Sequence, residues 1–160
     1  MGIAMAENKY IVFELADEFY GISIDSVERI LSEQKPTRLP KTAPMFLGVF
    51  DLRGETIPAI DLRIRFDFPK WEKESNFIVV LTKLGRCALK VDGVDGIVSL
   101  QDEDIDATAE IMKHKDDDFI SGVGKDGERL IVLLNTNHVV PTDLRNEIQA
   151  AADREPEAVA

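Results

Sequence analysis

The chain repeats part of its own sequence, and this repeat constrains the fold more than any other feature. Residues 20–27, YGISIDSV, align with residues 87–94, CALKVDGV, and both are apolar stretches that end in Asp-x-Val. A second match follows in the same order: Gly48-Val49, a turn at Arg53-Gly54 and a run ending at Asp61 recur as Gly122-Val123, a turn at Asp126-Gly127 and a run ending at Asn135. Each unit alone is too small to bury its sheet well, so the repeat predicts two small barrels that share one core.

Short apolar runs rich in Val, Ile and Leu indicate that the fold is mainly β. Residues 10–24 hold two such runs around an Asp17-Glu18 turn, which predicts a hairpin. The later runs, punctuated by Gly, Pro or Asp, are GVFDL, ETIPAI, FIVVLTKL, CALKV, GIVSL and RLIVLL. A few short helices are expected between them, over residues 25–30, 61–66 and 137–140, with a C-terminal helix over 142–151.

Polar segments set the expected domain boundaries. Residues 1–8 are predicted to be a flexible N-terminus, and residues 9–150 to be one domain of two β-barrel subdomains. Residues 151–160 are predicted to be a flexible tail because they are small and charged and offer little to bury. The acidic stretch over residues 101–118 is expected to form a surface excursion before the last hairpin.

Charge and cysteine content indicate the cellular setting. The formal net charge of −11 over 160 residues argues against a surface that neutralises phosphates, and hence against a nucleic-acid ligand. The single Cys87 cannot form an internal disulfide and suits a reducing cytosol. The first residues lack the pattern of a secretory signal, and no apolar run reaches the roughly 20 residues of a membrane helix. The sequence therefore predicts a cytoplasmic protein that reaches a membrane only through a partner.

Two segments resemble ligand-binding loops but are better explained as ordinary structural features. Residues 122–127 fit G-x-G-x-x-G, but a strand-like run follows where dinucleotide binding needs a helix, so a hairpin turn is the preferred interpretation. Residues 102–106 imitate the start of a calcium loop, but Ala107 and Lys113 stand where the loop needs glycine and glutamate. A solvated acidic surface is the better account of this stretch.

Catalytic and transition-metal sites are not indicated either. His114 and His138 have no ligand-spaced neighbours, and His138 is expected to pack beside Val139 and Val140. No serine lies in G-x-S-x-G, and Cys87 lies in an apolar strand, where an inert buried thiol is expected. Acidic pairs for general acid–base catalysis stay open as an alternative because such pairs form in space. We expect no enzyme activity, no metal and no cofactor.

The most distinctive segment covers residues 39–63 and reads LPKTAPMFLGVFDLRGETIPAIDLR. It resembles the CheW family, whose pattern is approximately L-P-x-x-P-x-x-x-x-G-V-x-N-L-R-G-x-I-x-P-V-I-D-L-R. Residues 19–30, FYGISIDSVERI, look like the family's Y-G-I-x-I-x-x-V-x-E-I, and residues 91–94 look like its V-D-G-V. The resemblance covers residues 9–140.

This resemblance implies both a fold and a function. The fold would be two interlocked five-stranded SH3-like β-barrels, in agreement with the repeat. The protein would be an adaptor, monomeric in isolation, that couples the cytoplasmic hairpin tip of a chemoreceptor (methyl-accepting chemotaxis protein) to the regulatory domain of the histidine kinase CheA. Micromolar pairwise contacts would be reinforced by multivalent assembly into receptor arrays at the membrane.

The resemblance also implies a receptor-binding surface, on which a receptor helix lies in a groove between the barrels. The residues assigned to it are Val27, Glu28, Arg29, Asp51, Arg53, Gly54, Val91 and Val94. The three valines are equally open to a core interpretation, and Arg53 could be a turn residue held by an internal carboxylate. Gly54 is expected to adopt the positive φ of a tight turn, and Pro58 predicts a strand edge or a bulge. No kinase-binding residues are assigned.

Two positions depart from the family pattern. Asp51 stands where the pattern has asparagine, and Arg29 stands where it has glutamate. An amide that donates becomes a carboxylate that only accepts, and an acid becomes a base, so the charge of the partner is expected to differ here.

Three other functions remain as alternatives. Two are close relatives: the receptor-coupling domain of a CheV-like protein, and a free-standing relative of the kinase's regulatory domain. No phosphoacceptor domain follows within the 160 residues, which favours the CheW interpretation. A small β-barrel ligand-binding module would need a pocket with convergent polar groups.

Overall fold

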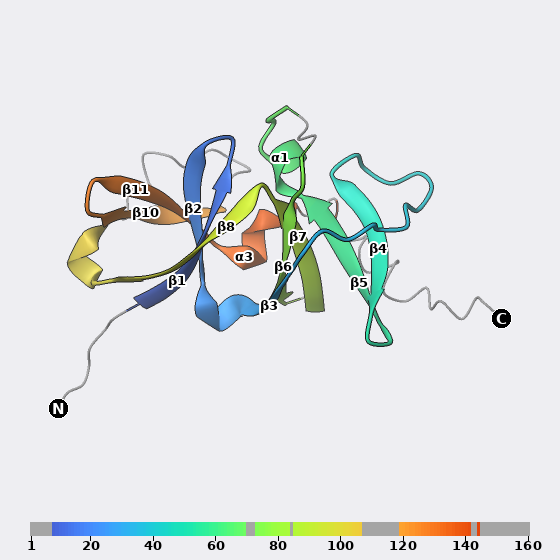
Figure 1. The fold of residues 1–160 in the computed structure, drawn as a ribbon, viewed down its shortest axis with the longest axis horizontal. Helices are drawn as coiled ribbons and strands as arrows, with labels where there is room; N and C mark the ends of the chain where they lie inside the picture. The colour runs from blue at the N-terminus through green and yellow to red at the C-terminus, as the bar shows by residue number, and fades with distance from the viewer. Residues whose placement is uncertain (1–7, 70–72, 84, 107–118, 142–143, 145–160) are drawn as a thin grey trace.

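The computed structural model of the protein describes residues 8–69, 73–83, 85–106, 119–141 and 144. Within these residues the chain forms two sheets, which lie on opposite sides of the molecule in Figure 1. The first sheet has the order β8 (Gly93–Leu100), β1 (Asn8–Leu15), β2 (Glu18–Ser23), β11 (Arg129–Leu134), β10 (Ile120–Asp126) and β9 (Ile105–Asp106). The second has the order β3 (Val27–Leu31), β6 (Asn76–Thr82), β7 (Gly85–Val91), β5 (Glu55–Asp61) and β4 (Phe46–Leu52).

The prediction of a mainly β fold with two barrel-like subdomains and few helices is confirmed. The second sheet has the expected five strands, and the two-residue strand β9 adds a sixth to the first. The described helices are single turns: η1 (Ile24–Ser26), α1 (Leu62–Arg65), η2 (Asp102–Asp104) and α3 (Thr136–Val139).

Two of the expected helices overlap α1 and α3, but the expected helix over residues 25–30 is wrong. There η1 leads directly into β3, whose β-branched and apolar residues pair with β6. Most of the expected C-terminal helix, the acidic excursion beyond Asp106, and the expected flexible termini lie outside the described residues, except that Asn8 begins β1.

The two sheets are interlocked because the chain crosses between them twice. Strands β1 and β2 belong to the first sheet, β3 to β7 belong to the second, and β8 to β11 return to the first. The first crossing passes through η1, and the second passes through Asp92, between β7 and β8. Each sheet therefore combines two strands of one sequence repeat with the remaining strands of the other.

Local geometry bears out the sequence repeat. Gly48 in β4 and Gly122 in β10 both lie where the register shifts against the following strand. Asp61, the last residue of β5, and Asn135, the residue after β11, act in the same way, since each caps a four-residue helix by accepting a hydrogen bond from the backbone N–H two residues on. Strand β5 also pairs in parallel with β7, as β11 does with β2.

Apolar side chains fill a central core between the sheets and a smaller core inside each barrel. In β1, Ile11, Phe13 and Leu15 face the central core, whereas Val12 faces the core of the first barrel. This alternation follows from the two-residue period of a strand. Strands with both faces buried give the near-continuous apolar runs in the sequence, and the central core confirms that the two barrels share buried side chains.

Candidate partner-binding surface

The β4–β5 hairpin presents Arg53 at an exposed, conformationally unusual position. Arg53 and Gly54 form a two-residue turn between Leu52 and Glu55, with φ values of 54° and 86°. Two positive φ values are what such a hairpin turn requires, so the expectation for Gly54 is confirmed. A non-glycine residue in the left-handed region costs about 1–2 kcal/mol, so the backbone at Arg53 is held there against its preference.

The Arg53 side chain has no internal partner in the described part of the chain. Among the described residues no hydrogen bond or ion pair reaches its guanidinium, so the alternative of an internal carboxylate holding Arg53 has no support there. Asp51, also exposed, accepts from the Gly54 N–H at a long 3.4 Å. A carboxylate can thus occupy the position of the family's asparagine without disturbing the turn.

Arg86 connects this hairpin to strand β3. Its Nε lies 2.6 Å from Glu28 Oε1, and its Nη1 lies 2.6 Å from Glu55 Oε2. The hydrogen bond that Arg86 donates to Glu28 lowers the pKa of Glu28 and raises the pKa of Arg86. Because these side chains are half-exposed, water screens the attraction, and the bridge contributes more to position than to stability.

Arg29 follows Glu28 on β3 and lies directly opposite Val79 of β6. Its Nε is buried and has no hydrogen-bond partner among the described residues. A buried donor without an acceptor costs about 1–3 kcal/mol, which makes Arg29 an unusual residue at this position. Beside it, Leu81 is paired with Arg86 across β6 and β7 and leaves 47% of its surface exposed. We call Glu28, Arg29, Arg53, Glu55, Leu81 and Arg86 the arginine patch.

The three valines assigned from the sequence lie in or against the central core. Val91 is 1% exposed, and Val27 and Val94 are partly buried against the same core. Val27 begins β3 directly after the first crossing, and Val94 lies near the start of β8 after the second crossing. The structure therefore does not bring all eight assigned residues together on one exposed surface.

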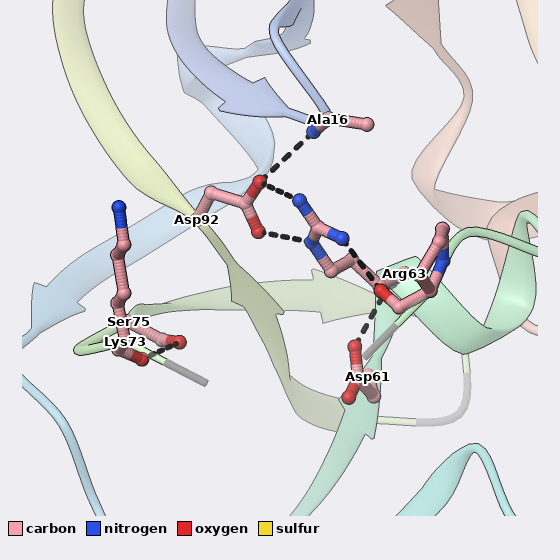
Figure 2. Close-up of polar contacts among 7 residues, drawn as sticks. Ala16, Asp61, Arg63, Lys73, Ser75 and Asp92 are labelled. Carbon is pink, nitrogen blue, oxygen red and sulfur yellow. Dashed lines mark hydrogen bonds and ion pairs between the residues drawn. The ribbon is translucent and has the colours of Figure 1, made fainter. Parts of the chain in front are cut away.

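A buried ion pair that the sequence did not predict holds the second crossing in place. Asp92 accepts two hydrogen bonds of 2.7 Å from Arg63 Nε and Nη2, and a third of 2.9 Å from the Ala16 N–H (Figure 2). Both side chains are more than nine-tenths buried, and the hydrogen bonds to Asp92 raise the pKa of Arg63. The pair joins α1, the β7–β8 crossing and the β1–β2 turn.

The matching place in the other repeat unit uses a different chemistry. There the Lys83 N–H, in the β6–β7 turn, donates directly to Asn137 Oδ1 of α3 at 3.1 Å. In this unit a neutral amide, at the position that corresponds to Arg63, joins α3 to the β6–β7 turn. Arg63 ends the family-like segment over residues 39–63, and Asp92 lies in the one over residues 91–94, but only their meeting in space shows that they form a pair.

The other interpretations drawn from the sequence have mixed outcomes in the described residues. Residues 122–127 lie in the β10–β11 hairpin, as expected. Asp102 and Asp104 hydrogen-bond to Asn8 and to the Gln101 N–H. His138 is exposed on α3 while Val139 and Val140 are buried, so its expected packing is wrong.

The described residues hold neither a membrane-spanning helix nor a metal-binding cluster. None of the helices in that part of the chain has the length and apolar character needed to span a bilayer. No group of three His, Cys, Asp or Glu side chains within those ranges could hold a metal ion.

Two interlocked barrels that share one core define a class of small, duplicated β-barrel domains. Within that class the chain belongs to the CheW-like domain family, whose model matches residues 9–143. It is 30% identical over 137 residues to the chemotaxis protein CheW of Klebsiella aerogenes, covering 84% of this chain and 82% of that protein. It is 31% identical over 134 residues to the CheW of Bacillus subtilis, with coverages of 82% and 86%.

A solved structure agrees with these sequence relatives. The crystal structure of the scaffolding protein TtCheW from Thermoanaerobacter tengcongensis matches with a TM-score of 0.75 and 27% identity, over 86% of this chain and 94% of that one. Together the relatives and the fold assign a chemotaxis scaffold or adaptor role to the chain, in a family of scaffolds rather than enzymes.

Proposed function

We propose that this protein couples the cytoplasmic tip of a chemoreceptor to the regulatory domain of the histidine kinase CheA, without catalysing a reaction itself. The observation that supports this most is the match of the CheW-like domain to residues 9–143, nearly the whole described fold. On this proposal the protein works in the cytoplasm, where binding to receptors recruits it to membrane-associated arrays.

The receptor contact is proposed to centre on the arginine patch and the β4–β5 turn. Arg53 and Asp51 are exposed there, and Gly54 allows the turn that presents them. Glu28 and Arg29 supply charge from β3. Val27, Val91 and Val94 act mainly by packing, because they fix the strands beside the two crossings and so set the shape of the surface.

Binding experiments on labelled protein separate the two partner surfaces. NMR chemical shifts are followed while a soluble receptor-tip hairpin, or the regulatory domain of the kinase, is added. We expect the receptor fragment to shift signals of Arg29, Arg53 and Leu81, and the kinase domain to shift a different set. If neither partner causes shifts, coupling is wrong and the ligand-binding alternative gains support.

Variants in cells test the same proposal. Arg53→Ala removes an exposed side chain without touching the core, so we expect normal folding with loss of array recruitment and of kinase activation. Val27→Asp places a charge against the central core and therefore needs a melting curve before its effect is interpreted. If both variants fold, still co-localise with receptors and still support kinase activation, the proposed receptor surface is wrong.

A further inference from the structure

We propose that the receptor segment bound by this protein is acidic where it meets the arginine patch, with carboxylates that pair with Arg29 and Arg53. This inference rests on the proposed receptor coupling and specifies its chemistry. It arises from the two arginines that have no acceptor among the described residues.

Every other arginine in the described ranges has an acceptor within the chain. Arg63 and Arg129 pair with aspartates, Arg86 pairs with two glutamates, and Arg38 and Arg65 donate to backbone carbonyls. Arg29 and Arg53 have none in the same ranges, although the chain carries 30 acidic residues against 19 lysines and arginines. The buried Arg29 Nε and the exposed Arg53 guanidinium both lack an acceptor among the described residues of a very acidic protein, and this points to a partner that supplies the acceptors.

The neighbouring carboxylates do not serve as acceptors for Arg29 and Arg53. Glu28 and Glu55 flank the two free arginines in sequence, but both already bind Arg86 at 2.6 Å. Asp51 lies on the opposite face of the hairpin from Glu55, because side chains alternate along a strand. The Arg86 bridge thus occupies Glu28 and Glu55. The charge of Arg29 helps to lower the pKa of Glu28, but neither Arg29 nor Arg53 has a hydrogen bond to a carboxylate among the described residues.

The residue types of the patch suit one face of an acidic helix. Leu81, which pairs with Arg86 across β6 and β7, offers an exposed apolar contact. Arg29 follows Glu28 on β3, and Arg53 lies in the turn that precedes Glu55. A guanidinium binds a carboxylate through paired N–H groups, which gives direction as well as attraction. The acidic remainder of the protein would repel the same segment elsewhere, so the patch also selects where the segment docks.

Binding affinity measures the effect directly. The purified full chain is titrated with the soluble receptor-tip hairpin by calorimetry, at low and at high salt. We expect Arg53→Glu and Arg29→Gln each to weaken binding about five- to tenfold at low salt, and the wild-type affinity to fall as salt rises. Lys125→Glu is the matched control, since it changes an exposed cation on β10 of the other barrel and should leave the affinity within about twofold.

A charge exchange completes the test. Replacing the acidic residues of the receptor tip one at a time with arginine should identify one whose change weakens the wild type but restores binding of Arg53→Glu. Binding that is insensitive to salt and to both substitutions would overturn the acidic-partner inference while leaving receptor coupling intact. No binding of the wild type to the hairpin would overturn both. Arg29→Gln retains a neutral donor and Arg53 lies on an exposed turn, so at least one variant should remain folded.

Discussion

Arg63 and Asp92 form a buried, doubly hydrogen-bonded ion pair at the point where the chain crosses from the second sheet back to the first. The carboxylate also binds the Ala16 N–H, so a single side chain fixes the relation between α1 and the β1–β2 turn. Burial in a low-dielectric environment makes this pair sensitive to loss of either partner.

Removing one partner of this pair should destabilise the fold strongly. We expect Arg63→Ala or Asp92→Ala to lower the free energy of unfolding by about 3–5 kcal/mol, because each leaves an uncompensated buried charge. The double variant should lose less than the sum of the two, measured in a denaturant-based double-mutant cycle. Asp95→Asn, which loosens the partly exposed pair with Arg129, is the control and should cost about 1 kcal/mol or less. Equal effects for the buried and the exposed pair would contradict this account.

Gly48 should tolerate no side chain. It has a φ of 124°, and a Cβ there would clash with the carbonyl oxygen of Thr37, which accepts from the Val49 N–H. Gly48→Ala should therefore cost at least about 1–3 kcal/mol from the backbone conformation alone. Gly93→Ala is the matched change, since its Cβ would meet no atom within 4 Å. Thermal melts of the two variants measure this difference in stability. Similar melting temperatures for both would contradict the prediction, because they would mean that the backbone near Thr37 moves to accept the new Cβ.

Cys87 should be chemically inert while the protein is folded. Burial raises the pKa of its thiol from 9.0 to about 12, so almost no thiolate exists at neutral or mildly alkaline pH. A thiol-reactive dye should react only after denaturant is added. Because the unfolded thiol ionises more easily, stability should also fall as pH rises above 9, and Cys87→Ala should reduce that fall. Rapid labelling of the native protein at pH ~8 would be evidence against the buried position.

The Glu28–Arg86 bond should give a small stability change at acid pH. Its hydrogen bond holds the pKa of Glu28 below the ordinary 4.5, so the folded state favours the ionised form. The contribution is then present above pH 4.5 and is lost as pH falls through the lowered value. Glu28→Gln should reduce the difference in denaturation midpoint between neutral and acid pH, whereas Glu128→Gln, in the exposed β10–β11 turn, serves as control. Identical pH profiles for wild type and Glu28→Gln would rule this contribution out.

Several features of the fold could be predicted because they depend on neighbouring residues. The apolar runs predicted strands, and Arg53-Gly54 predicted a tight turn. The sequence repeat aligned Asp61 with Asn135, and in the structure both residues cap a short helix in the same way. The prediction of a strand edge or bulge at Pro58 is wrong, because Pro58 is buried in β5 between β4 and β7 and the register shift lies between Phe46 and Gly48. Its missing N–H is tolerated because β5 begins to pair with β7 only at Ala59. The incorrectly predicted helix over residues 25–30 shows the limit, since pairing with β6 outweighed local propensity.

By itself the sequence determined the β class, the duplication and the family, because apolar periodicity, turn residues and motifs are local properties of the chain. Only the tertiary structure decided that the repeats exchange strands, that Arg63 meets Asp92, and that Arg86 occupies Glu28 and Glu55 while Arg29 and Arg53 have no acceptor in the described ranges. Those relationships join residues that are far apart in the chain, and no spacing encodes them. They follow from where the two crossings place each strand, which the packing of the shared core decides.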